Sequence, residues 1–243
     1  MEAALLAWFD VHGRALPWRK TRDPYAILVS EVMLQQTQVD RVVPHYLRWL
    51  ARWPTAEALA GARCSQVIRA WQGLGYNRRA VNLHRAAQHI AARGWPADLT
   101  TLPGIGRYTA DAIACFAFGA PVLPLDTNIR RVQERTGLTF SPRSAQALMD
   151  LGRTVCVARV PRCGECPLAA ACPSRGRRYA PLRRQTRFEG SFRQRRAQAL
   201  RLVADRPRRL ADLDGEAVNA LERDGLVRRC GDSVALPEDF SLS

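Results

Sequence analysis

Two carboxylate side chains each interrupt an apolar stretch of this sequence. Glu31 lies inside AILVSEVMLQQTQV (residues 26–39), and Asp126 lies inside VLPLDTNIRRV (residues 122–132). An uncompensated carboxylate in an apolar interior is costly, so such a group is usually paired, protonated or chemically active. For Asp126 a helix N-cap is the alternative, because Asp is common there. Together, two carboxylates in different environments suit cleavage of a glycosidic bond, with one donating a proton and one stabilising the sugar cation.

Four cysteines form a second candidate site, in CVARVPRCGECPLAAAC (residues 156–172). Gaps of six, two and five residues separate Cys156, Cys163, Cys166 and Cys172, so their thiolates can converge on one inorganic centre. Disulfides suit a cytoplasmic chain poorly. The spacing alone fits structural zinc as well as an iron–sulfur cluster. The remaining cysteines, Cys64, Cys115 and Cys230, stand singly, and we expect them to be inert.

A glycine-containing turn precedes a predicted helix in TTLPGIGRYTADAIACFAFG (residues 100–119). Gly104 and Gly106 permit a tight turn and leave backbone amides free at a helix N-terminus, where a phosphate can bind. An ordinary interhelical turn also uses glycine. The net charge favours the phosphate interpretation.

The chain of 243 residues carries 37 Lys and Arg against 22 Asp and Glu, a net charge of +15, and almost all the basic residues are Arg. So basic a chain usually has a polyanionic partner such as nucleic acid, although genome base content also enriches Arg. No apolar run reaches the roughly 18–20 residues of a membrane span, and the first residues do not resemble a signal peptide. We therefore expect a cytoplasmic protein, associated with the nucleoid and not with membranes.

Apolar residues recur at helical spacing over most of the first two thirds of the chain, and strand alternation is scarce. Turn and cap signals separate the expected helices. These helices are expected at residues 3–12, 25–38, 40–52, 56–61, 64–73, 77–93, 107–117, 127–136 and 143–156. The pattern predicts a mainly α fold of short helices.

An ordered set of motifs carries a family resemblance: LPWR (16–19), SEVMLQQTQV (30–39), GLGY (73–76), LPGIGRYTA (102–110), LDTNIRRV (125–132), ALMDLG (147–152) and the four-cysteine loop. Over about residues 4–175 the chain resembles the helix-hairpin-helix DNA glycosylases that carry a 4Fe-4S cluster, and among them it is most similar to the adenine DNA glycosylase family. The resemblance implies a two-lobed, endonuclease III-like fold. Expected parts are an iron–sulfur lobe (1–21 and 127–175), a helical barrel lobe (22–126), an Arg-rich linker (176–190) and a small winged-helix-like domain (191–243).

The resemblance also implies roles for single residues. Glu31 matches the general acid that protonates the departing adenine, Asp126 the carboxylate that stabilises the sugar cation, and Asn128 the amide beside it. Tyr108 stands where related bifunctional enzymes have a lysine nucleophile, and a phenol cannot form a Schiff base. Cys156, Cys163, Cys166 and Cys172 match the ligands of a 4Fe-4S cluster. The implied enzyme is a monofunctional hydrolase of base excision repair that removes adenine opposite 8-oxoguanine or guanine.

Further matches concern double-stranded DNA containing a mispair, the expected partner of a monomeric protein. The target nucleotide must leave the duplex before it can reach a buried acid. Gln36 and Tyr76 match residues that wedge into the duplex beside the opposite base, and Leu102, Gly104 and Gly106 belong to the DNA-binding hairpin. The match also implies an adenine pocket lined by Trp18, Arg19, Leu34 and Asp150. Alternatively, Trp18 and Leu34 are core, Arg19 is solvated and Asp150 pairs with an arginine.

The last third of the chain departs from the family pattern. Residues 174–196 read as a solvated, Arg-rich linker, followed by two or three helices and a hairpin around Gly231 and Asp232. The larger Nudix-like domain of other members, with its Phe-Ser-His loop for 8-oxoguanine, is not evident, and no histidine follows His89. Two other functions therefore stay open: a thymine glycosylase for T·G mismatches, and a non-enzymatic module that binds mismatched DNA.

Overall fold

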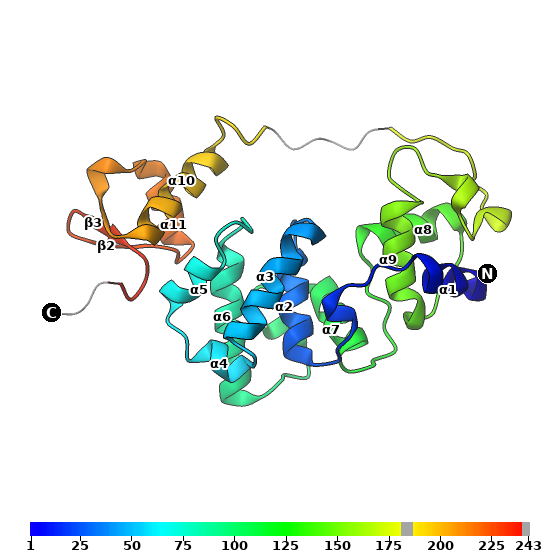
Figure 1. Ribbon diagram of the computed structural model, residues 1–243, viewed down its shortest axis with the longest axis horizontal. Helices are drawn as coiled ribbons and strands as arrows, with labels where there is room; N and C mark the ends of the chain where they lie inside the picture. Colours follow the sequence, from blue (N-terminus) through cyan, green and yellow to red (C-terminus); the bar gives the residue numbers. More distant parts are fainter. Residues whose placement is uncertain (181–186, 240–243) are drawn as a thin grey trace. The chain divides into compact units, whose positions relative to one another are not determined.

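The computed structural model describes residues 1–180 and 187–239, and most of these residues are helical (Figure 1). The chain divides into two compact units, Met1–Ile27 with Gly106–Arg184 and Leu28–Ile105 with Gln185–Ser243. Helix α2 (Pro24–Leu34) begins in the first unit and continues into the second. Within the described ranges no helix has the length and apolar character needed to cross a membrane. The mainly α fold expected from the sequence is confirmed.

The first unit holds the helices α1 (Glu2–His12), α7 (Arg107–Phe116), α8 (Thr127–Thr136) and α9 (Ala145–Thr154). Apolar residues three or four positions apart give each helix a buried face. Leu5 of α1 joins Ile129 and Val132 of α8 and Leu148 and Leu151 of α9 in one core. Burial of each such side chain contributes about 1.5–3 kcal/mol, so this core fixes the helices that carry Asp126 and Asp150.

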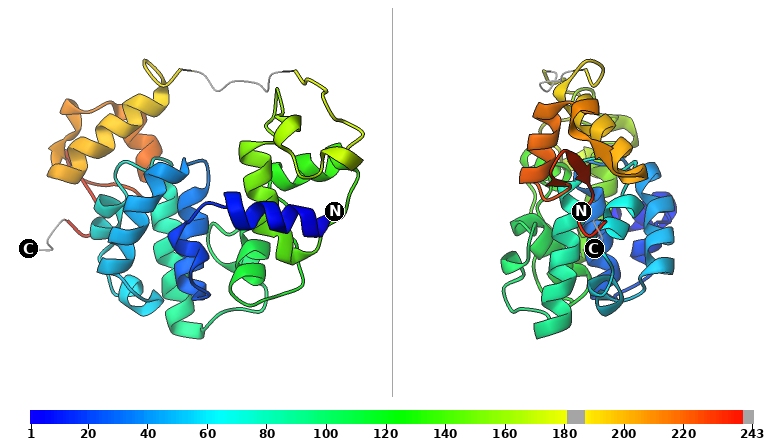
Figure 2. Two further views of the ribbon diagram at one scale, coloured as in Figure 1. Left: turned by 45° about the vertical axis from the view of Figure 1, so that its right-hand side comes forward. Right: turned by 90° about the vertical axis from the view of Figure 1, so that its left-hand side faces the viewer.

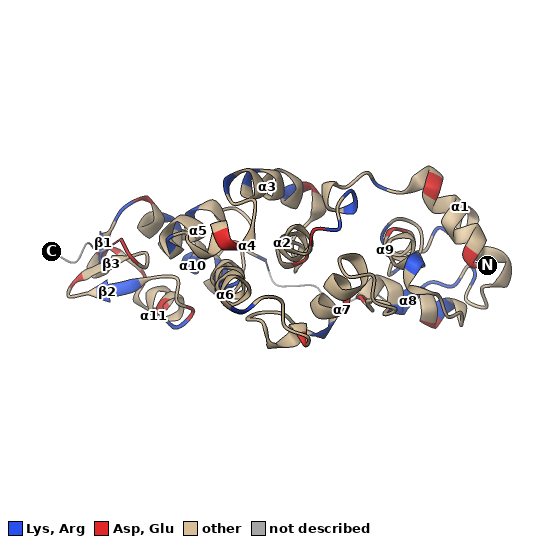
Figure 3. Ribbon diagram, turned by 90° about the horizontal axis from the view of Figure 1, so that it is seen from below, with Lys and Arg blue, Asp and Glu red and all other residues tan. Residues whose placement is uncertain are grey.

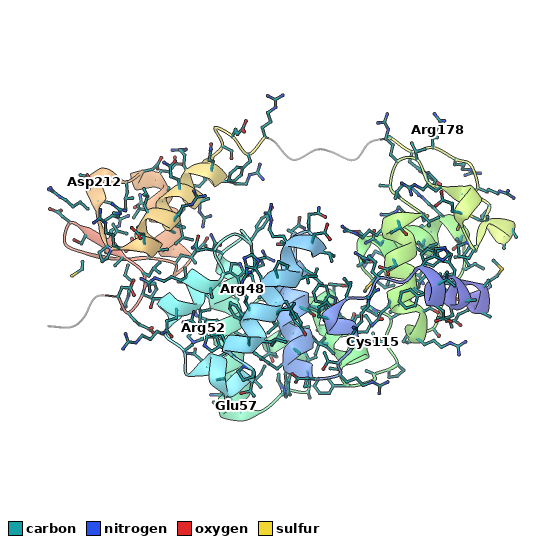
Figure 4. All side chains as sticks on the ribbon, viewed as in Figure 1. Arg48, Arg52, Glu57, Cys115, Arg178 and Asp212 are labelled. Carbon is teal, nitrogen blue, oxygen red and sulfur yellow. The ribbon has the colours of Figure 1, made fainter. Side chains whose placement is uncertain are left out.

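The second unit holds the remainder of α2 together with the helices α3 (Val39–Arg52), α4 (Ala56–Ala60), α5 (Cys64–Ala70) and α6 (Arg78–Arg93). Helix α2 is buried on nearly all sides, which matches its continuous apolar sequence. Helix α3 instead buries Val42, Tyr46 and Trp49 on one face. Figure 3 shows basic residues along the α3 ribbon, and Figure 4 shows its Arg48 and Arg52 side chains.

The last part of the chain forms a small helix-and-sheet unit. It holds α10 (Phe192–Asp205), β1 (Arg208–Arg209), α11 (Gly215–Arg223), β2 (Arg228–Cys230) and β3 (Ser233–Ala235). The antiparallel sheet has the order β1-β3-β2, with Gly231 and Asp232 between β2 and β3. This arrangement confirms the predicted winged-helix-like unit and its terminal hairpin.

The winged-helix-like unit packs on helices α5 and α6 of the same compact unit (Figures 1 and 2). Ile68 of α5 and Val81 of α6 share a single buried core with Leu200 and Val203 of α10 and Leu226. Polar contacts border this core, including an N–H of Cys64 that donates to a carboxylate oxygen of Glu238 at 2.8 Å. The core therefore joins two stretches of chain that are far apart in sequence.

Short 3-10 turns connect several of these elements. They are η1 (Pro17–Arg19), η2 (Leu99–Thr101), η3 (Pro142–Ser144), η4 (Cys163–Glu165), η5 (Ala169–Ala171) and η6 (Leu210–Asp212). Two of them, η4 and η5, lie inside the four-cysteine loop. That loop is thus a series of tight turns and not an extended strand.

The structure differs from the sequence predictions in the end of α2, in the unit that holds α7 and in the stretch expected to be a linker. The helix expected over 25–38 ends at Leu34, because the backbone of Gln36 adopts a left-handed conformation with φ 61°. Helix α7 lies in the first unit and not with the barrel lobe of residues 22–126, since Phe116 packs against the core around Ile129.

The third difference concerns the stretch expected to be a solvated linker. Residues 192–196 belong to α10, and Arg195 pairs with Asp214 at 2.7 Å and with Glu216 at 2.9 Å. Arg196 pairs with Asp224. Both arginines therefore form ion pairs within the winged-helix-like unit. Residues 181–186 of the expected linker lie outside the described part of the chain.

Candidate active site

Glu31 lies in the middle of α2 and is buried, with 6% of its surface exposed. Ser30, Val32 and Met33 around it are at most 3% exposed. The apolar setting predicted from the sequence is therefore present. A carboxyl group can donate or accept a proton, so Glu31 is a candidate general acid.

Asp126 is the N-cap of α8, and both of its oxygens accept hydrogen bonds. Oδ1 accepts the Ile129 N–H at 2.6 Å, and Oδ2 accepts the Asn128 side-chain amide at 2.8 Å. The capping alternative is thus confirmed, and it is compatible with chemistry, since the cap fixes the orientation of the carboxylate. The half-buried side chain lies at the N-terminus of α8, where a carboxylate interacts favourably with the helix dipole.

Arg131 links this carboxylate to the four-cysteine loop. Its Nη2 donates to Asn128 Oδ1 at 2.7 Å, its Nε donates to the Cys156 carbonyl at 2.8 Å, and Nη2 also reaches the Gly152 carbonyl. Gly152 is required here, because a Cβ at this position would lie 2.6 Å from the Asn128 Cβ. Helices α8 and α9 therefore approach closely enough for one guanidinium to connect Asn128 with the loop.

All four cysteines of the loop line one cavity in the first unit, together with Val132, Arg135 and Leu151. Two sulfurs accept hydrogen bonds, Cys163 Sγ from the Gly176 N–H at 3.3 Å and Cys156 Sγ from Arg135 Nη1 at 3.5 Å. Burial raises the pKa of the Cys166 thiol; a hydrogen bond with the Leu168 backbone opposes this shift, and the charges of the other three cysteines add to it. Within the described residues no three His, Cys, Asp or Glu side chains are arranged to hold a single metal ion.

Arg135 also fastens the beginning of the loop. Its guanidinium donates to the carbonyls of Val157 at 2.8 Å and Ala158 at 2.6 Å, and it lies 3.7 Å from the centre of the Tyr179 ring. Cys115, by contrast, lies on α7 (Figure 4) and is not among the residues that line the cavity. Burial raises the pKa of its thiol, which donates to the Pro142 carbonyl at 3.9 Å. The expectation that Cys115 is inert agrees with this geometry.

Arg19 and Asp150, two of the predicted pocket residues, contact each other in the first unit. Arg19 donates to both oxygens of Asp150, at 2.7 and 3.0 Å, and Arg14 donates from its Nε at 2.9 Å and from its backbone N–H at 3.0 Å. Asp150 is only 1% exposed. Burial alone would raise its pKa, but the hydrogen bonds from Arg19 and Arg14 hold that pKa below the usual value. The alternative that Asp150 pairs with an arginine is therefore observed, and an adenine-binding role for it stays a prediction.

The predicted DNA-contacting residues of the second unit lie on loops. Gln36 follows α2, Tyr76 precedes α6 with 49% of its surface exposed, and both have left-handed backbones, with φ 61° and 46°. Gly104 has φ 76°, and a Cβ there would lie 2.7 Å from Asn82 Nδ2. Leu102 is buried beneath this turn. The hairpin thus needs glycine at position 104 both for its conformation and for its close approach to α6.

The other predicted site residues are distributed between the two units. Trp18, Tyr108 and Gly106, the N-cap of α7, lie in the first unit, while Leu34 ends α2 in the second. Trp18 is buried and Tyr108 is half-buried in the first turn of α7. The sequence reasoning missed the arginines that organise these elements, Arg79, Arg131 and Arg135. In a chain so rich in arginine, residue type alone gives no signal for them.

Comparison with known proteins agrees with this geometry. Residues 29–154 match the family described as "HhH-GPD superfamily base excision DNA repair protein". The adenine DNA glycosylase of Mycolicibacterium smegmatis is 42% identical over 272 residues, which cover 94% of this chain and 92% of the relative. The match therefore extends through the winged-helix-like unit.

Solved structures have the same fold. A thermostable thymine-DNA glycosylase superposes with a TM-score of 0.64 and 25% identity, covering 71% of this chain and 93% of that one. An endonuclease III trapped as a covalent DNA intermediate superposes with a TM-score of 0.60 and 22% identity, covering 70% of this chain and 93% of that one. The chain belongs to the HhH-GPD superfamily of base excision DNA repair proteins and, within it, to the family of adenine DNA glycosylases.

Proposed function

We propose that the protein is a monofunctional DNA glycosylase that removes adenine mispaired with 8-oxoguanine or guanine. The observation that carries the proposal is the contrast between two carboxylates, Glu31 buried in an apolar helix and Asp126 held by two hydrogen bonds at a helix N-terminus. The family membership supplies the substrate class, since the relative that matches 94% of the chain is an adenine DNA glycosylase.

The roles of these residues follow from their chemistry. Glu31 would donate a proton to the flipped adenine, which converts a poor leaving group into a neutral one. Asp126 would stabilise the positive charge that develops on the sugar, with Asn128 holding its carboxylate in place. Water would then add to the sugar, because Tyr108 offers no amine for a covalent intermediate.

A panel of duplexes that differ only at the central pair tests this function. The protein is expected to release base from A·8-oxoguanine and A·G duplexes and to leave an intact strand that breaks only after alkali treatment. Release from a T·G duplex alone would instead establish the second candidate, a thymine glycosylase, which the similarity to a solved thymine-DNA glycosylase supports. Strand cleavage without alkali would contradict a monofunctional mechanism. We further propose that the protein acts as a monomer on duplex DNA.

We also propose that Cys156, Cys163, Cys166 and Cys172 hold a 4Fe-4S cluster. The donor set fits, because four cysteine side chains line one cavity and cysteine sulfurs are the ligands of such clusters. When bound, the cluster would supply a rigid cross-link for the turns of the loop.

Anaerobic purification tests the cluster. The protein is expected to be brown, with broad absorbance at the blue end of the visible spectrum and about equal amounts of iron and acid-labile sulfide. Cys166→Ser should lose much of this iron, whereas Cys230→Ser should keep it, since Cys230 is exposed on β2. A colourless, zinc-loaded protein would refute the assignment.

A further inference from the structure

Arg79, the second residue of α6, is buried beneath both loops that carry the predicted wedge residues. Only 8% of its surface is exposed. The first of these is the α2–α3 loop (residues 35–38), which contains Gln36, and the second is the α5–α6 loop (residues 71–77), which contains Tyr76. The two loops lie in the same compact unit, and the Thr37 hydroxyl donates to the Leu74 carbonyl at 3.3 Å.

The guanidinium divides its donors between the two loops. Towards the end of α2 and the α2–α3 loop, Nη1 donates to the carbonyls of Val32 at 2.8 Å, Met33 at 2.9 Å and Gln35 at 2.6 Å, and Nη2 donates to Thr37 Oγ1 at 2.9 Å. Towards the α5–α6 loop, Nη2 donates to the carbonyls of Leu74 at 3.3 Å and Gly75 at 2.9 Å, and Nε donates to that of Tyr76 at 3.3 Å. One planar side chain thereby fixes both backbones.

Aromatic rings hold this guanidinium in place. Its central carbon lies 5.1 Å from the centre of the Trp71 ring and 5.7 Å from that of the Tyr76 ring. Trp71 in turn donates from Nε1 to the Gly75 carbonyl at 3.1 Å. Burial lowers the pKa of Arg79 to about 10, so the group is still a cation at neutral pH. A lysine could not reproduce these contacts, because a compact ammonium has only three donors and no planar fork.

Both wedge residues have backbones that need such support. Gln36 and Tyr76 have φ values of 61° and 46°, in the left-handed region that side chains with a Cβ adopt only at an energetic cost. Such conformations persist where surrounding contacts over-determine them. Arg79 supports both conformations through the backbone, because it donates to the carbonyl of Gln35, just before Gln36, and to the carbonyl of Tyr76 itself.

We propose that Arg79 is a positioning residue that holds the α2–α3 and α5–α6 loops in one register, so that Gln36 and Tyr76 enter the duplex together when the target nucleotide leaves it. This inference rests on the proposed function, since it assigns the residue to the flipping step of a base-excising enzyme. The hydrogen bonds of Arg79 go to these two loops and to the end of α2, so we expect its loss to act on the flipping step.

Stopped-flow fluorescence separates flipping from chemistry. A 2-aminopurine placed beside the target adenine of an A·G duplex brightens when the neighbouring base unstacks, and single-turnover excision is measured on the same duplex. For Arg79→Lys we expect the fluorescence rise to slow by about 10- to 100-fold, as for the loss of one or two hydrogen bonds to a charged group. Excision should slow by the same factor. Thr37→Val, which removes only the hydroxyl shared by the two loops, should show the same pattern with a smaller effect.

Arg93→Lys is the matched control, because Arg93 is exposed at the opposite end of the same helix. It should leave both signals unchanged. An Arg79→Lys protein that is folded by circular dichroism but excises slowly with a normal fluorescence rise would overturn the inference, as would one with both signals normal. If Arg79→Lys does not fold, Thr37→Val decides by the same criteria. Wild-type unstacking without excision from any mispair would instead remove the proposed function and leave the inference on Arg79 standing.

Discussion

Glu31→Gln is expected to slow adenine excision by about 100- to 10,000-fold, the usual effect of removing a general acid. Glutamine keeps the size and polarity of the side chain but has no acidic proton to give. The neighbouring residues of α2 are buried, and glutamine has nearly the same volume as glutamate, so the change should leave packing intact. Single-turnover excision from an A·G duplex measures the rate, and a fluorescence anisotropy titration with the same duplex measures binding, which should stay close to normal.

Glu57→Gln provides the control for this experiment. Glu57 is an exposed residue in the first turn of α4 (Figure 4), and the same chemical change there should alter neither rate nor binding. Loss of duplex binding by Glu31→Gln, with a lowered melting temperature, would make Glu31 a structural residue. Absence of excision from every mispair by the unmodified protein would favour the non-enzymatic module.

Asp126→Asn is expected to lower the excision rate by about 100- to 1,000-fold without loss of stability. Asparagine is as good an N-cap as aspartate, so the bond to the Ile129 N–H can be kept. What disappears is the negative charge, together with the acceptor for the Asn128 side-chain amide. Removal of one preorganised electrostatic partner typically costs a rate factor of this size. Asp126→Ala should lose the charge and the cap together and should destabilise the protein by about 0.5–2 kcal/mol.

Asp214→Asn is the matched variant, since Asp214 caps α11 by accepting the Ala217 N–H at 2.8 Å. It makes the same substitution at the same helical position in the winged-helix-like unit and should leave excision unchanged. Thermal denaturation followed by circular dichroism reports the capping effect of each variant. If Asp126→Asn excised adenine at the normal rate, Asp126 would be a cap alone.

The helices of the chain were predictable because their signals are local. The ranges expected at 40–52 and 127–136 match α3 and α8 to within a residue, since Pro, Gly and Asp mark their ends. The end of α2 was not predictable in this way. Residues 35–38, which directly follow Leu34, contain no glycine or proline. The carbonyls of Val32 and Met33 at the end of that helix accept hydrogen bonds from Arg79, which lies in another helix.

The residues of the candidate site show the same difference between local signals and contacts that form only on folding. The cysteines, Glu31 and Asp126 stood out because their residue types and spacing are unusual within a short stretch. Partners that meet only after folding left no comparable signal. Examples are Asp150 with Arg14 and Arg131 with the Cys156 carbonyl, because such pairs depend on how α8, α9 and the preceding chain pack together.

The core that joins Ile68 and Val81 to Leu200 and Val203 has a consequence for how this protein can be dissected. A chain cut before α10 would expose the packed faces of α5 and α6 to water and would lose part of their folding cooperativity. The α5–α6 loop, which carries Tyr76, would lose support as well. The winged-helix-like unit therefore contributes to the stability of helices α5 and α6.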